Sequence, residues 1–194
     1  MSGQGKRIVL ASASPRRREL LSGLGIDYEI IIPDGDEESV VASSPAALAE
    51  ARALLKAQAA ADMIDDGIAI GADTIVVCDG HVLGKPRDEA DAVHLLETLS
   101  GRTHVVITGV SVCQAGGASL VERAETEVTF RPLEREEIER YVATGEPMDK
   151  AGAYGIQGKG ALLVEQIVGD YFIVFGLPLT LLASMLRTFD VRLL

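Results

Sequence analysis

Three consecutive arginines, Arg16 to Arg18, follow a stretch of small residues and open a predicted helix. Residues 11–14 lack bulky side chains, so backbone N–H groups there can approach a ligand closely, and Pro15 suits the first position of a helix. Cations are unfavourable at a helix N-terminus, where the dipole is positive, unless an anion lies there. A solvated basic turn is the alternative. We favour a phosphate or carboxylate site on which the guanidinium groups of Arg16, Arg17 and Arg18 converge.

A single aspartate, Asp73, lies in the middle of an apolar run, residues 67–78, that predicts a central strand. Burial of an unpaired carboxylate would cost several kcal/mol. Asp73 must therefore pair with a cation, bind a metal ion or lie at a break that opens onto a cleft, and all three settings permit catalysis. The alternative is a carboxylate that accepts hydrogen bonds from neighbouring backbone N–H groups.

A predicted hairpin brings a lysine towards this aspartate. The dipeptide at residues 79–80, Asp-Gly, is a strong hairpin signal, and the strand that follows it ends at Pro86. Lys85 would return towards the level of Asp73 and Thr74. The pair of a carboxylate and an ammonium group suits a charged substrate.

Two further segments carry charged groups of interest. The acidic turn at residues 33–38 follows a predicted strand, so Glu37 or a neighbour could bind a divalent ion that bridges phosphates, although most acidic turns are only solvated. A predicted Ala-rich helix, residues 45–62, has an expected apolar stripe of Leu48, Ala51, Leu55 and Ala59. Lys56 lies beside this stripe and could reach a phosphate or extend into water.

The segment at residues 149–161, DKAGAYGIQGKGA, is the second unusual stretch of the chain. Its four glycines make it a poor helix and a poor strand, so we expect a loop whose backbone takes special angles or approaches a ligand. A flexible linker is the alternative. Linkers seldom contain Ala, Tyr, Ile and Gln with so little Ser or Pro, which favours a substrate loop with Gln157 among its functional side chains.

The helices and strands expected around these residues indicate a mixed α/β protein. Further helices are expected at residues 15–24, 88–99, 133–144 and after Pro178, and strands at residues 8–10, 28–32, 103–113 and 124–130. The last two strands should pair as an antiparallel hairpin. We expect another hairpin around Gly169 and Asp170.

Composition excludes several classes of protein. A chain of 194 residues with 47% hydrophobic content predicts a globular protein, and its net charge of −11 argues against general binding of nucleic acid. The sequence has no Walker A motif, no metal-type cysteine spacing and no apolar run long enough to cross a membrane. Cys78 and Cys113 lie in apolar runs and are expected to be buried thiols. We expect a cytoplasmic protein without membrane contact whose local basic pocket takes a small anion, as in phosphoryl transfer.

Six motifs in register resemble the Maf family across almost the whole chain: SASPRR, GADTIVV, LGKPRD, SGRTHVVITGV, DKAGAYGIQGKGA and GLPL. The resemblance implies a nucleoside triphosphate pyrophosphatase, a hydrolase acting on acid anhydrides, that releases a nucleoside monophosphate and diphosphate. AGAYGIQG is similar to the branch that acts on dTTP and UTP, with modified pyrimidine nucleotides as further candidates. A housecleaning role against non-canonical nucleotides is a hypothesis at the level of the family.

The resemblance also assigns roles to residues. Asp73 resembles the proton acceptor that activates water for attack on the α-phosphorus, and Glu37 resembles an acidic position that could hold Mg²⁺ or Mn²⁺ together with Asp73. Relatives often read L-A-x-x-K-A where this chain offers both Arg52 and Lys56, and we choose Lys56 for its spacing to Asp73. The resemblance also implies a set of residues for base specificity, which is Arg16, Thr74 and Gln157. It implies a phosphate-binding set, which is Ser12, Arg17, Lys56 and Lys85. Lys56 and Lys85 would be catalytic together with Asp73.

The fold implied by the resemblance is an elongated, twisted mixed β-sheet flanked by helices. Two lobes would surround a central cleft, as in inosine triphosphate pyrophosphatases, and residues 1–194 would form a single Maf-like domain. The resemblance also implies that the protein forms a homodimer. The alternative from another class is a nucleotide-binding regulator that inhibits septum formation through partners.

Overall fold

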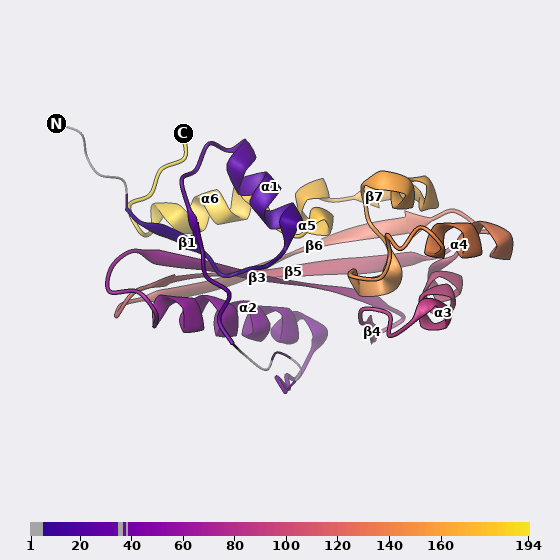
Figure 1. Cartoon of the computed structure of the whole chain (residues 1–194), viewed down its shortest axis with the longest axis horizontal. Helices are drawn as coiled ribbons and strands as arrows, with labels where there is room; N and C mark the ends of the chain where they lie inside the picture. Colours follow the sequence, from indigo (N-terminus) through magenta and orange to yellow (C-terminus); the bar gives the residue numbers. More distant parts are fainter. Residues whose placement is uncertain (1–5, 35–36, 38) are drawn as a thin grey trace. The chain divides into compact units, whose positions relative to one another are not determined.

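A computed structural model of the chain describes residues 6–34, 37 and 39–194. In this part of the chain seven strands form one sheet in the order β2-β1-β3-β5-β6-β7, with β4 paired to β3 (Figure 1). β1 is parallel to β2 and β3, whereas β4 is antiparallel to β3 and β7 is antiparallel to β6. The predicted mixed α/β class is therefore confirmed.

The chain divides into two compact units. The first contains Met1–Asp73, Thr108–Ala124 and Gly176–Leu194, and the second contains Thr74–Ile107 and Glu125–Phe175. Three strands, β3 (Ile68–Cys78), β5 (Thr103–Gln114) and β6 (Ser119–Phe130), contribute residues to both. The first unit also holds β1 (Ile8–Leu10), α1 (Pro15–Gly23), β2 (Glu29–Ile30), α2 (Pro45–Ala61) and α6 (Leu179–Arg187).

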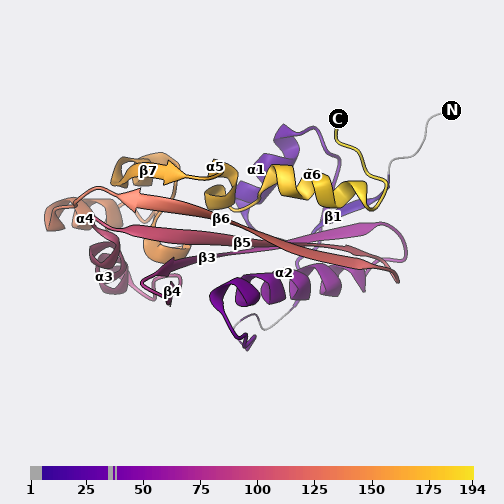
Figure 2. The same ribbon diagram turned by 180° about the vertical axis from the view of Figure 1, so that it is seen from behind.

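Strand alternation gives the first unit two apolar layers. Ile8, Leu10, Ile68 and Ile70 pack with Leu21 of α1 and with Leu182, Met185 and Leu186 of α6. Val9 and Ala69, which point the other way, pack with Ala57, Ala60 and Ala61 of α2. Figures 1 and 2 show α2 on one face of these strands and α1 with α6 on the opposite face.

The expected apolar stripe of α2 is wrong. Leu48, Ala51, Leu55 and Ala59 are only half-buried, whereas the buried face consists of Ala49, Ala53, Ala57, Ala60 and Ala61. Only small side chains fit on this face because α2 lies very close to the sheet. A Cβ atom built at Gly71 would lie 2.4 Å from the carbonyl oxygen of Ala53. Alanines facing glycines thus set the helix–sheet distance.

We expect Gly109→Ala to destabilise the protein by roughly 1–3 kcal/mol, because its Cβ would overpack this contact. The Cβ would lie 2.3 Å from the carbonyl oxygen of Ala49, and that backbone cannot move without shifting α2. Denaturant unfolding measures the effect. Gly23→Ala is the matched control, since a Cβ there meets nothing within 4 Å. Equal unfolding midpoints for the two variants would contradict the predicted overpacking.

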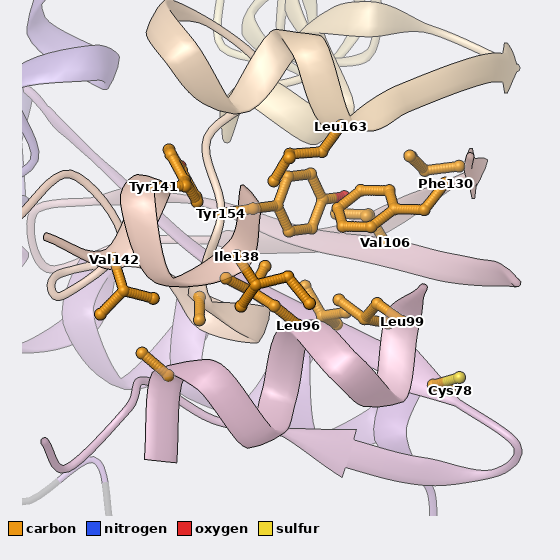
Figure 3. Packing of buried hydrophobic residues seen from close by; sticks show 14 residues of the cluster. Cys78, Leu96, Leu99, Val106, Phe130, Ile138, Tyr141, Val142, Tyr154 and Leu163 are labelled. Carbon is orange, nitrogen blue, oxygen red and sulfur yellow. The ribbon is translucent and has the colours of Figure 1, made fainter. Parts of the chain in front are cut away.

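The second unit has its own apolar core. It comprises β4 (His81–Leu83), α3 (Glu89–Leu99), α4 (Arg135–Val142), the 3₁₀ turns η1 (Ala151–Ala153) and η2 (Gly158–Leu163), β7 (Val164–Val168) and α5 (Tyr171–Phe175). Leu96, Leu99, Ile138, Phe130 and Tyr154 lie in one buried cluster (Figure 3). The rings of Phe130 and Tyr154 meet edge to face with centroids 4.7 Å apart.

A histidine is buried beside these rings. His104 is 1% exposed, and its Nε2 lies 2.8 Å from the Tyr154 hydroxyl. Burial lowers the pKa of His104 from 6.5 to about 4. The unfolded chain therefore binds one more proton than the folded chain between these two pH values.

Unfolding free energy should consequently fall as the pH falls from about 6.5 towards 4. A shift of this size corresponds to about 3 kcal/mol from His104 alone. His104→Gln cannot take up this proton, so its stability should depend less on pH over the same interval. Denaturant unfolding at pH 7 and pH 4.5 compares the two chains, and equal pH dependences would contradict the prediction.

Two expected elements differ from the structure. The strand expected at residues 28–32 is shorter: β2 covers Glu29–Ile30 at the sheet edge, although Ile31 still donates a backbone hydrogen bond to Leu10. The hairpin expected around Gly169 and Asp170 is wrong, because α5 follows β7 directly. The Asp170 carboxylate accepts a hydrogen bond from the Phe172 N–H at 2.8 Å, which favours a helical turn over a strand.

Cys78 and Cys113 are buried and unpaired, as expected. In the part of the chain that the structure describes, no helix combines the length and apolar character needed to cross a membrane.

Candidate active site

Asp73 is a buried carboxylate on β3, and strand alternation points it towards α2. It follows Ala69 and Gly71 on that face of the strand. Its Oδ1 accepts a hydrogen bond from Lys56 Nζ at 2.7 Å, and each of these two side chains is 13% exposed. Its Oδ2 is buried and has no hydrogen-bond partner among the described residues. Of the three settings expected for Asp73, pairing with a cation is the one that these contacts show.

Lys56 and Arg52 lie one turn apart on α2 and both face Asp73. Lys56 Nζ also contacts the Glu37 carboxylate at 2.7 Å, while Arg52 NH1 lies 3.9 Å from Asp73 Oδ2. Arg52 Nε donates to the backbone carbonyl of Glu37 at 3.0 Å. The choice of Lys56 over Arg52 thus agrees with the closer contact. The sequence analysis did not choose Arg52, yet Arg52 lies next to the site. Its i, i+4 spacing to Lys56 places both residues on the same face of the helix.

Arg17 is buried at the start of α1. Its Nε donates to the Gly176 carbonyl at 2.8 Å, and its NH1 donates to Ser12 Oγ at 3.1 Å. Ser12 Oγ also accepts from the Ser14 N–H, so Ser12 fixes both the arginine and the small-residue loop. Burial lowers the pKa of Arg17, and the negative charges of Asp73 and Glu37 oppose that shift. Arg17 therefore belongs to the same charged environment as the carboxylates.

The three arginines do not all converge, which corrects the idea of a single arginine cluster. Arg18 NH2 donates to the Ala13 carbonyl at 2.9 Å, so its guanidinium folds back onto its own loop. Arg16 is half-buried. Burial is the main cause of the lowered pKa of Arg17, and the positive charge of Arg16 lowers it further, whereas the charge of Asp73 raises it. Arg16 and Arg17 remain as the basic pair of the helix N-terminus.

The remaining predicted site residues belong to the second unit. Thr74 follows Asp73 along β3 and therefore points to the opposite face of the strand. The hairpin is confirmed, and its register of Val76 with Leu83 would set Lys85 opposite Thr74 if it continued. β4 ends at Leu83, however, and Lys85 is exposed beyond it.

Gln157 is exposed between the two 3₁₀ turns, in the loop that the glycines predicted. The expected special backbone angles are present there, with φ of 68° at Gly152 and 69° at Gly158. The first unit thus groups Ser12, Arg16, Arg17, Glu37, Lys56 and Asp73, and the second holds Thr74, Lys85 and Gln157.

Among the described residues, Glu37 and Asp73 are carboxylates that could hold a divalent cation, each with one oxygen in contact with Lys56 Nζ. Asp73 Oδ2, buried and without a hydrogen-bond partner among the described residues, could face such an ion directly or through a water. Mg²⁺ is commonly held by one or two carboxylates together with substrate phosphates, so this donor set fits Mg²⁺ or Mn²⁺. Within the described residues no cluster of three or more acidic, His or Cys side chains forms a metal cage. Residues 35, 36 and 38 of the predicted acidic turn lie outside the described residues.

Known proteins resemble this chain in sequence and in fold. The family model described as Maf-like protein matches residues 7–189. A protein of Moorella thermoacetica named dTTP/UTP pyrophosphatase is 56% identical over 95% of this chain and 96% of its own length. One of Symbiobacterium thermophilum with the same name is 53% identical over 95% and 94%. The Staphylococcus aureus Ham1 protein shares the fold, with a TM-score of 0.53 and 20% identity over 82% of this chain and 80% of its own.

Proposed function

The chain belongs to the Maf family, and on this premise we propose that it hydrolyses dTTP and UTP between the α- and β-phosphates. The products are dTMP or UMP and diphosphate. The observation that carries the proposal is the buried Asp73. Its Oδ2 has no hydrogen-bond partner among the described residues, and its carboxylate lies near the charges of Lys56, Arg52 and Arg17. A carboxylate among cations suits the attack of water on a polyanion.

Asp73 is the general base in this proposal. Lys56 occupies Oδ1 and fixes the direction of the carboxylate, which leaves a lone pair on Oδ2 for the attacking water. Proton transfer to a positioned carboxylate is worth roughly 10²- to 10⁴-fold in rate. A base must keep that lone pair, so we expect any metal contact of Asp73 to run through the water.

The cations of the site bind and orient the phosphates. Ser12 and Arg17 present a hydroxyl and a guanidinium at the α1 N-terminus, where N–H groups and the helix dipole also favour phosphate. Lys56 lies against the base and can neutralise charge on the triphosphate, and Lys85, exposed on its own unit, would share this role.

Two further roles complete the proposed site. A divalent cation held by Glu37 and Asp73 would neutralise developing charge on the phosphates. Arg16, Thr74 and Gln157 would contact the pyrimidine base. The exposed amide of Gln157 can donate to and accept from a base edge, which is what recognition of uracil or thymine needs.

The cellular setting is part of the same proposal. Residues 1–194 would act as one Maf-like domain of two lobes, assembled as a homodimer in the cytoplasm. The two unpaired thiols are typical of a reducing compartment, and the net charge of −11 disfavours nucleic acid as a partner. The substrate is then a free nucleotide.

Product analysis tests the proposed function. The protein is incubated with dTTP, UTP, CTP, ATP and 7-methyl-GTP in the presence of Mg²⁺ or Mn²⁺, and products are separated by ion-pair chromatography. We expect diphosphate with dTMP or UMP. Orthophosphate with a nucleoside diphosphate would mean attack at the γ-phosphorus and would overturn the proposal. Tight nucleotide binding without turnover would instead favour the septum regulator.

A further inference from the structure

The loop that carries Gln157 is held by a carboxylate from outside it. Glu146, which follows α4, accepts hydrogen bonds from two consecutive backbone N–H groups of the loop: Lys159 N–H to Oε2 at 3.0 Å and Gly160 N–H to Oε1 at 2.9 Å. Burial alone would raise the pKa of Glu146, but these hydrogen bonds, together with that of the Tyr141 hydroxyl and the charge of Lys150, outweigh burial and lower the pKa. The carboxylate is thus ionised and fixed to the loop backbone.

A second tether joins the same carboxylate to the core. The Tyr141 hydroxyl donates to Glu146 Oε1 at 3.0 Å and accepts from the Gly155 N–H at 3.1 Å. Tyr141 is buried in the core cluster of the second unit, next to Tyr154 (Figure 3). Gly155 and Gly160, on either side of Gln157, are therefore both tied to the pair of Tyr141 and Glu146.

The glycine pattern of the loop follows from this arrangement. A Cβ at Gly158 would lie 2.8 Å from Glu146 Oε2, and Gly158 has a φ of 69°, which disfavours any side chain. A Cβ at Gly160 would lie 2.6 Å from the Tyr141 hydroxyl and 2.3 Å from the Gly155 carbonyl oxygen. These glycines leave room for the carboxylate and hydroxyl that hold the loop.

We propose that Glu146 is a positioning residue for recognition of the nucleotide base, acting by fixing the loop backbone on both sides of Gln157. The inference rests on the proposed function, in which Gln157 contacts the base. A side chain that discriminates between bases by hydrogen bonds must be held within a fraction of an ångström, and a shift of about 1 Å can cost roughly 100-fold. Gln157 is exposed and has no cap hydrogen bond of its own, so its position depends on its backbone.

The test compares Glu146→Ala and Glu146→Gln with the wild-type chain. kcat and KM are measured for UTP and for CTP, whose bases differ in the groups that an amide reads. We expect Glu146→Ala to lower kcat/KM for UTP by roughly 10- to 100-fold, chiefly through KM, and to shrink the preference for UTP over CTP. The kcat/KM of Glu146→Gln for UTP should lie between those of the wild type and Glu146→Ala, since the amide N–H₂ of Gln would face the Lys159 N–H.

Two comparisons separate positioning from general stability. Glu136→Ala, an exposed glutamate of α4, removes the same charge and should leave selectivity unchanged. Glu146→Ala added to Gln157→Ala should cause little further loss of selectivity, because both act through one contact. A variant that is merely less folded would lose kcat equally for all nucleotides and keep its KM, and that result would overturn the proposal.

Hydrogen exchange distinguishes this inference from the proposed function. In the wild-type chain without substrate, the Lys159 and Gly160 amides should exchange slowly, and Glu146→Ala should speed their exchange. Fast exchange in the wild type would overturn the tether even if diphosphate is released. Slow exchange in a chain that releases no diphosphate would leave the tether standing while overturning the proposed function and, with it, the role in base recognition.

Discussion

Asp73→Asn should lower turnover of dTTP and UTP by roughly 10²- to 10⁴-fold, because it removes the proposed base and leaves the shape of the site intact. Asparagine matches aspartate in size, and its carbonyl can accept the Lys56 hydrogen bond that Oδ1 accepts now. The amide group in place of Oδ2 cannot take a proton from water. Since Lys56 keeps Glu37 as a partner, we expect the variant to fold.

Steady-state release of diphosphate measures the effect, with nucleotide binding followed separately. Asp62→Asn is the matched control, since it changes the same functional group on an exposed residue at the end of α2. Binding of UTP should survive in Asp73→Asn, because the phosphate-binding cations are unchanged. Turnover within a factor of about two of the wild type would exclude Asp73 as the base.

The sequence predicted elements best where local signals were strong. The Asp-Gly turn after β3 appears as a hairpin with φ of 49° at Asp79 and 79° at Gly80, and Ser44 caps α2 as a serine before proline suggests. It failed where an apolar run fits either period. Residues 171–175 are apolar throughout, so their pattern does not separate a helix from a strand, and the local hydrogen bond from the Phe172 N–H to the Asp170 carboxylate favours the helical turn of α5.

The buried face of α2 failed for a different reason. Hydrophobic periodicity favours the larger side chains, so it selected Leu48 and Leu55 over the alanines. The decisive feature is the close approach of α2 to Gly71 and Gly109, and those glycines lie on other segments. No pattern within one helix reveals how near its partner lies.

In the candidate site too, local spacing could be read from the sequence, whereas side-chain conformation and contacts between distant segments could not. Lys56 could be chosen from its spacing to Asp73, and the structure joins the two side chains directly. Arg18 could not be separated from Arg16 and Arg17 by sequence, because its return to the Ala13 carbonyl is a matter of side-chain conformation. Glu146 gave no signal at all. A glutamate after a helix usually faces water, and its three partners lie before and well after it in the chain.

Lys56→Met should both destabilise the protein and abolish most turnover. The ammonium group lies 2.7 Å from Asp73 Oδ1 and 2.7 Å from Glu37 Oε2, so its removal leaves a buried carboxylate unpaired beside a second negative charge. Removing one partner of a buried ion pair costs about 3–5 kcal/mol. We expect about 3 kcal/mol, because Glu37 is partly exposed and Arg52 remains 3.9 Å from Asp73.

Denaturant unfolding of Lys56→Met, Asp73→Asn and the double variant decides whether the pair is the cause. Arg192→Met, which removes an exposed positive charge, is the control for net charge. Because the double variant buries no unpaired charge, it should be more stable than Lys56→Met alone while remaining inactive. If the two losses of stability simply add, Lys56 and Asp73 are not coupled. Lys56 would then contribute to turnover by contact with the phosphates alone, and Oδ1 as well as Oδ2 would be open to the attacking water.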